Sequence, residues 1–180
     1  MLIMPSSFIR SLIILLLAIA AAGCGETLRT TIAVHHALPD RSKETGYAFV
    51  QFKDQEENPE NQSYRNLIRS ELARFRYRET DSANAALLLS FSYGIDRGRD
   101  RKDPGIFRDD RAAEYRKSLW VFLYEKDAGE QGERKVVYEG SVVCAGPLSM
   151  MGNIMPVMIR ELFFDFPGES DSKRTVLLSP

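Results

Sequence analysis

The sequence has few of the residues from which metal centres and disulfide frameworks are built. Its 180 residues include two cysteines and two histidines. Two cysteines cannot form the several bridges that hold small secreted domains together. His35 and His36 are adjacent, and neighbouring strand residues point to opposite faces, so the pair is not arranged to share a metal. We therefore expect neither a metal nor a cofactor.

An excess of charge of one sign is also absent. The chain has 24 Lys and Arg against 25 Asp and Glu, whereas a nucleic-acid-binding domain usually carries a basic patch. We therefore expect no nucleic-acid partner. Residues 96–111 concentrate six basic and five acidic side chains. The interpretation we favour is a solvated loop whose charges neutralise one another, and the alternative is a phosphate or polyanion site.

The first residues have the layout of a secretory signal. Arg10 provides a positive charge, Leu12–Ala22 form an apolar run, and small residues lead to Cys24. Eleven apolar residues are too few for a comfortable transmembrane helix, which needs about 20. We predict that residues 1–23 are a signal peptide. An uncleaved membrane anchor is the alternative.

Cys24 is the predicted site of lipid attachment. Ala21-Ala22-Gly23-Cys24 resembles the bacterial lipobox, in which cleavage between Gly23 and Cys24 leaves a cysteine whose thiol carries a diacylglycerol. Residues 24–27 would then be a lipidated tether to the membrane. Gly25, where an Asp would direct inner-membrane retention, favours the outer membrane, facing the periplasm. Ordinary signal-peptidase cleavage after Ala22 is the alternative, and it would leave Cys24 free to pair with Cys144.

The remaining chain alternates strand and helix patterns. Strands are expected at residues 27–36, 47–52, 85–95, 118–124 and 134–145, and helices are expected to be capped by Asn61 or Ser63 and by Asn153. Cys144 is expected to be a small buried residue on a strand. This order predicts an α+β fold with a mostly antiparallel sheet of about five or six strands and two helices packed on one face. Residues 28–168 form the single domain, and 169–180 a tail that could add an edge strand.

Several segments resemble the bacterial lipoprotein family catalogued as domain of unknown function 4136. The segments are "GYAFVQF", "YRNLIRSELARFRYRE", "ANAALLLSFSYGID", "LWVFLYEKDAGEQGERKVVYEGSV" and "IMPVMIRELFFDFPG", within Leu28–Gly168. The resemblance implies an envelope lipoprotein and no known activity. One position departs from the family pattern: Arg76 precedes Tyr77 where the family usually has Gly. A Gly there would end the helix in a left-handed turn, so this helix could end differently.

No catalytic motif is recognisable, because the sequence lacks a Gly-rich phosphate loop, a nucleophile elbow and a paired-carboxylate pattern. We therefore predict a non-enzymatic module that binds another envelope protein or a larger assembly. The alternative is a small periplasmic ligand-binding protein or hydrolase whose site is scattered along the chain. Candidate contact residues for the partner are Met150, Met151, Met155 and Met158, since methionine suits adaptable binding surfaces. The competing interpretation places these methionines in the core.

Overall fold

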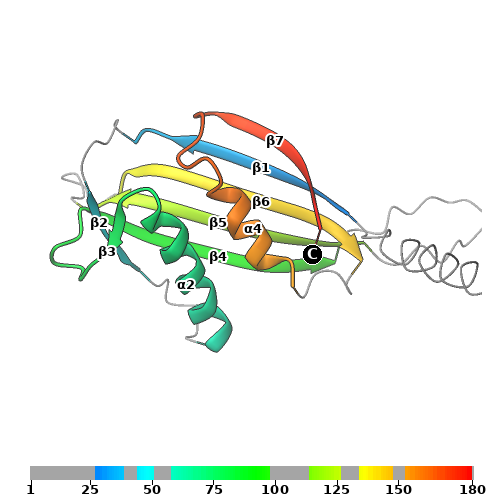
Figure 1. The fold of residues 1–180 in the computed structure, drawn as a ribbon, viewed down its shortest axis with the longest axis horizontal. Coiled ribbons are helices and arrows are strands. Elements are labelled where there is room, and N and C mark those ends of the chain that lie inside the picture. Colours follow the sequence, from blue (N-terminus) through cyan, green and yellow to red (C-terminus); the bar gives the residue numbers. More distant parts are fainter. Residues whose placement is uncertain are drawn as a thin grey trace, which may run out of the picture.

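The computed structural model describes residues 27–38, 44–50, 58–97, 114–126, 134–147 and 153–179. Two helices lie against one face of a seven-stranded sheet (Figure 1). The strands are Leu28–His36 (β1), Thr45–Phe49 (β2), Tyr77–Glu79 (β3), Leu87–Arg97 (β4), Glu114–Glu125 (β5), Val136–Pro147 (β6) and Ser172–Leu178 (β7), and the helices are Pro59–Ala73 (α2) and Met155–Leu162 (α4).

The sheet is mostly antiparallel, as predicted, and its strand order is β3-β2-β4-β5-β6-β1-β7. Strand β2 is the exception, since it pairs in parallel with both β3 and β4. Parallel neighbours need a crossover connection, and α2 lies between β2 and β3 in the chain. The long strands β4, β5 and β6 form the centre of the sheet, and β5 is the fourth of the seven strands.

The predicted strand count was wrong, because the sheet has seven strands instead of five or six. The strand that the pattern does not reveal is β3, whose three residues are too few to show an alternation. The C-terminal segment forms an edge strand, β7, which pairs with β1 along its whole length. Only the short β3 separates strand β2 from the edge of the sheet.

Both predicted helix caps were wrong by a few residues. Asn58 caps α2, and its side chain accepts a hydrogen bond from the Asn61 amide at 2.7 Å, with Pro59 in the first turn. Ile154 precedes α4 and makes no side-chain capping bond. Pro at the first helical position is favourable because its missing N–H would have no intrahelical partner, which explains why both helices begin at a proline-containing turn.

The core lies between the helices and one face of the sheet. Tyr64 of α2 packs edge-to-face against Tyr93 of β4, with ring centroids 4.9 Å apart. Below α4, Tyr138 of β6 packs against Phe166, at 4.9 Å. The predicted burial of Cys144 on a strand is confirmed, since it lies in β6 with no exposed surface. We call the face that carries these residues the helix face and the opposite face the open face.

Arg76 retains the left-handed turn that the family resemblance placed in question. Its φ is 64°, and its carbonyl accepts a hydrogen bond from the Thr45 amide at 3.0 Å, directly before β3 begins. An L-residue with a side chain pays about 1–2 kcal/mol in this conformation, whereas glycine adopts it freely. The turn between α2 and β3 therefore exists without glycine and at a cost to stability.

Helix α4 lies close to the sheet at Gly140 of β6. A methyl group at this position would lie 2.6 Å from the Tyr138 hydroxyl oxygen and 2.9 Å from Cδ1 of Leu162 in α4. Both distances are shorter than real contacts, so the Tyr138 ring and the helix occupy the space of a side chain. Gly94 of β4 differs, because a methyl group there meets nothing within 4 Å.

We predict that Arg76→Gly stabilises the domain by about 1 kcal/mol, since it removes the steric cost of the left-handed turn. Equilibrium denaturant unfolding measures the change. Arg76→Ala is the matched control: it also loses the exposed guanidinium, whose contacts are worth at most about 1 kcal/mol, but keeps the Cβ atom. Equal stability of the two variants would contradict the explanation.

We predict that Gly140→Ala destabilises the domain by about 1–3 kcal/mol, as overpacked core substitutions do. Gly94→Ala places the same methyl group at a position of β4 that has open space, and we expect a change within about 0.5 kcal/mol. Thermal unfolding of the two variants tests the close approach of α4. A Gly140→Ala variant as stable as the wild type would show that the helix shifts at no cost.

Candidate functional site

A polar cluster lies where the first turn of α2 covers the sheet. The Tyr64 hydroxyl donates a hydrogen bond to Glu60 at 2.5 Å. Burial, reinforced by the Glu60 carboxylate, raises the pKa of Tyr64 above its usual value, and burial likewise raises the pKa of Tyr93 beside it. Both phenols therefore stay protonated at neutral pH. They can donate hydrogen bonds, but they do not act as bases or nucleophiles.

Lys117 is buried on the helix face of β5. Its side chain is 3 % exposed, and its register partner on β6 is Cys144. Burial lowers the pKa of Lys117, because the charged ammonium loses its hydration. Burial also raises the pKa of the Cys144 thiol. A thiol held protonated is a poor nucleophile, and Cys144 is fully buried, so it lacks the accessible setting of a reactive cysteine.

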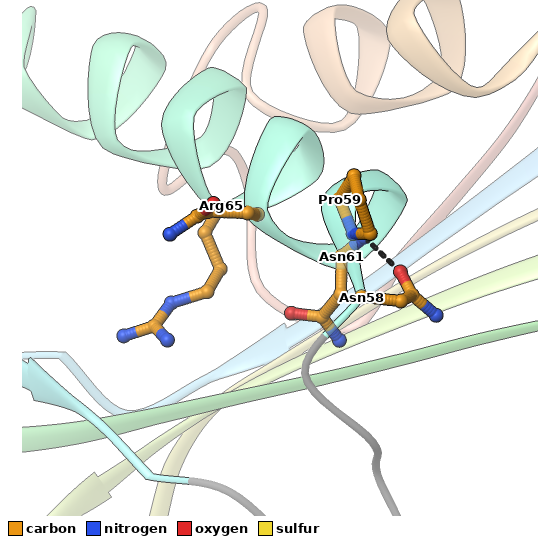
Figure 2. A pocket seen from close by; sticks show the side chains of 5 residues that line it. Asn58, Pro59, Asn61 and Arg65 are labelled. Atoms are coloured by element: carbon orange, nitrogen blue, oxygen red, sulfur yellow. Dashed lines mark hydrogen bonds between the residues drawn. The ribbon is translucent and has the colours of Figure 1, made fainter.

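A hollow of about 240 Å³ opens beside the N-terminus of α2 (Figure 2). Its lining residues are Asn58, Pro59, Asn61, Gln62 and Arg65. The Arg65 guanidinium lies 4.6 Å from the centroid of the Phe49 ring and 3.9 Å from Glu79. Three carboxamides and one guanidinium can hydrogen-bond a ligand, but none of them can exchange a proton near neutral pH. The hollow can therefore bind a polar ligand, but its lining residues provide no acid–base pair for catalysis.

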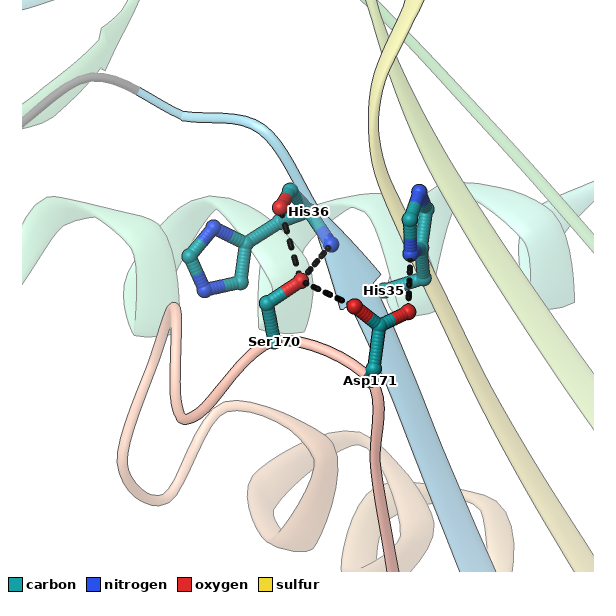
Figure 3. Close-up of polar contacts among 4 residues, drawn as sticks. All are labelled: His35, His36, Ser170 and Asp171. Carbon is teal, nitrogen blue, oxygen red and sulfur yellow. Dashed lines mark hydrogen bonds and ion pairs between the residues drawn. The ribbon is translucent and has the colours of Figure 1, made fainter.

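His35, Ser170 and Asp171 have the residue types of a hydrolytic triad, at the end of β1 (Figure 3). Nδ1 of His35 lies 2.6 Å from Asp171. The Ser170 hydroxyl accepts a hydrogen bond from the His36 amide at 3.0 Å and donates one to the His36 carbonyl at 2.8 Å. In a working triad the histidine stands between serine and carboxylate. Here the carboxylate stands between the other two, since the Ser170 hydroxyl lies 3.5 Å from Asp171, so the histidine does not face the hydroxyl.

The open face of the sheet carries an aromatic ladder on its central strand. Trp120, Phe122 and Tyr124 of β5 project from this face, since Val121 between Trp120 and Phe122 is paired with Gly140 on the helix face. Their rings are near-parallel, with centroids 6.4 Å and 6.1 Å apart along the strand. Trp120 is 36 % exposed, and Phe122 and Tyr124 are half-buried. Helices α2 and α4 both lie over the other face of the sheet, the helix face (Figure 1).

The predicted site residues have different outcomes. Met155 and Met158 are fully buried, so these two fill the core, as in the competing interpretation, and are not on the surface of the folded domain. Cys24, Gly23, Met150 and Met151 lie outside the described residues, as does most of the charged loop 96–111. Their predicted roles stay predictions.

The aromatic ladder is the feature that sequence reasoning missed. The signal was present, because "SLWVFLY" places three aromatic residues at alternate positions of a predicted strand. The pattern does not reveal which face the helices cover, since both faces of this strand are apolar.

Two further features are absent from the described residues. Within them, no group of three or more His, Cys, Asp or Glu side chains could hold a metal ion. No helix in this part of the chain combines the length and the apolar character needed to cross a membrane.

Comparison with known proteins gives a likeness of fold. No protein-family model matches the sequence, and no curated protein matches it either. Among solved structures, a domain of unknown function 4136 family protein from Bacteroides thetaiotaomicron is 13 % identical, with a TM-score of 0.51 over 78 % of this chain and 97 % of the other. The PelC dodecamer from Paraburkholderia phytofirmans is 16 % identical, with a TM-score of 0.46 over 74 % and 94 %. The fold resembles that of the first protein, in agreement with the resemblance of the sequence segments.

We predict that Lys117→Met raises the melting temperature at neutral pH, because it removes a buried ammonium. The sign follows from the lowered pKa. Between the folded-state pKa and the unfolded value near 10.5, the unfolded chain binds more protons, so wild-type stability rises with pH. The advantage of the variant should therefore shrink as the pH approaches 10.5.

Thermal unfolding from pH 6 to pH 10.5 checks this expectation about Lys117. Lys135→Met is the control, since Lys135 is exposed and pairs with Glu125 at 3.3 Å. A pH-independent gap between wild type and Lys117→Met would show that the ammonium is not the destabilising group.

Proposed function

We propose that this protein is a lipid-anchored lipoprotein of the bacterial envelope whose domain is a non-enzymatic interaction module. One observation carries the proposal for the domain: the centre of the sheet presents Trp120 and two further aromatic side chains on a face that neither helix covers. Tryptophan and tyrosine are the residues most enriched at the energetic centres of protein interfaces. The open face is thus the binding surface.

The anchor follows from the lipobox at Cys24. A diacylglycerol with two chains holds a protein on the membrane far more firmly than one chain does. The first strand begins at Leu28, so only a short tether separates the domain from the anchor. The proposed location is the outer membrane, facing the periplasm, where another envelope protein is the expected partner. Met150 and Met151 remain candidates for additional contact.

A ligand-binding protein is the second candidate, and the hollow lined by Asn58, Asn61 and Arg65 favours it. Its carboxamides could bind a small polar molecule. The hydrolase form of this alternative has less support, because the Ser170 hydroxyl is engaged with the backbone of His36 and the His35 ring pairs with Asp171 instead of with the hydroxyl. The open face is the better candidate, since its exposed tryptophan gains more from burial than a polar hollow gains from a replaced water.

We predict that Cys24→Ala abolishes labelling of the protein by radioactive or alkyne-bearing fatty acid and releases any exported product from the membrane fraction. The alanine has no thiol to receive the diacylglycerol. Cys144→Ala is the control and should leave the labelling unchanged. Fatty-acid label on the Cys24→Ala protein, or its absence from the wild type, would refute the lipid anchor.

We predict that Phe122→Lys weakens crosslinked capture of envelope partners by at least about tenfold, because it places a charge in the aromatic ladder. Phe164→Lys is the matched control. Phe164 is 65 % exposed, and its ring lies 6.0 Å from the Arg174 guanidinium, away from the open face. Circular dichroism checks that both variants fold. Equal capture by the two variants would show that the open face is not the binding surface.

A further inference from the structure

We propose that the open face binds the same face of a second copy of this chain, so that two sheets pack face to face with the aromatic ladders at the centre. The inference rests on the proposed function, which makes this face the binding surface, and it names the partner. Two sheets that pack in this way lie about 10 Å apart and interdigitate their side chains.

The size of the face is sufficient for such a dimer. Strands β4, β5 and β6 have 11, 12 and 12 residues, which at about 3.3 Å per residue span about 35–40 Å. The other four strands have 9, 5, 3 and 7 residues, and neighbouring strands lie about 4.8 Å apart. Summed over the seven strands, the face measures about 900 Å², which is close to the roughly 800 Å² that each partner buries in a standard stable interface.

The charge pattern of the face also suits contact with itself. A two-fold axis brings residues near it onto their own copies, so a charged centre would repel. The cross-strand neighbours of Trp120 are Ser92 and Ser141, which carry no charge. Charges of both signs surround this position on the open face: Glu139 lies beside Phe122, and Asp96 lies beside Arg116 nearer the strand ends. An uncharged position at Trp120 with charges of both signs around it is compatible with contact between two identical faces.

The position of the ladder places its most exposed ring at the middle of this area. Trp120 lies on β5, the central strand, and near the middle of that strand. Residues that dominate binding cluster at the geometric centre of an interface, where surrounding contacts exclude water. The membrane tether adds to this, because copies anchored in one bilayer meet at a higher effective concentration than free copies.

The chain contains a single tryptophan, so Trp120 is itself the probe. The lipidated full-length protein is purified in detergent from cells that co-express two differently tagged copies. We expect the copies to co-purify. We also expect Trp120 emission to be blue-shifted and protected from acrylamide, and to shift to the red as dilution separates the copies.

Two substitutions on the open face should separate the copies. Phe122→Lys and Ser92→Lys should each reduce co-purification about tenfold or more and expose Trp120 to acrylamide. Ser92 is exposed, so its variant keeps the core intact even if Phe122→Lys fails to fold. Phe164→Lys should leave both measurements unchanged.

Two outcomes would refute the binding of a second copy, and they also show whether the proposed function fails with it. Copies that do not co-purify, with Ser92→Lys still weakening crosslinked capture of a different envelope protein, refute self-association and leave the interaction module standing. Trp120 that is protected at every dilution in a single copy shows that the chain covers its own face, which refutes both proposals. Loss of the dimer in the Ser92→Lys variant supports the inference, even if Phe122→Lys fails to fold, provided that Phe164→Lys still forms the dimer.

Discussion

The packing of both described helices on one face of the sheet is the constraint on which the rest of the structure depends. Because strand side chains alternate between faces, every residue that packs beneath α2 or α4 fixes a neighbour on the opposite face. Gly140 shows how strictly the helix face is filled, since a single methyl group has no room there. The same alternation therefore determines which residues lie on the open face, although neither described helix covers it.

Because the helices pack on one face only, the residues that stabilise the domain and the residues proposed to bind a partner lie mostly on opposite faces of the sheet. The titratable groups that a mechanism would need lie mostly on the helix face or at the end of the sheet. There burial shifts the pKa values of Tyr64 and Lys117, and hydrogen bonds to the backbone hold the Ser170 hydroxyl. These groups stabilise or strain the domain. The binding proposals come from the opposite face, where an aromatic strand meets solvent without a cost to the core.

The sequence was sufficient for the fold class and for most elements, because long strands and an amphipathic helix leave periodic patterns. It was insufficient where the deciding interactions are non-local. The three residues of β3 have no pattern of their own and form a strand only because β2 lies beside them. Because α4 packs on one face of the sheet, Met155 lies in the core, and Trp120 on the opposite face remains exposed. Arg76 shows that a turn can persist when the residue favoured there is absent.

The pairing of β1 joins segments from the two ends of the domain and has a consequence for the proposed export of the protein. Strand β1 is the first described strand, yet its partners are β6 and β7, the last two described strands to be synthesised. In the proposed lipoprotein, the first strand would therefore stay unpaired until nearly the whole chain has crossed the membrane. Such long-range pairing slows folding, and slow folding would keep an exported chain in the extended form that a translocation channel admits. On this proposal, the sheet closes beside the lipid tether only at the end of translocation.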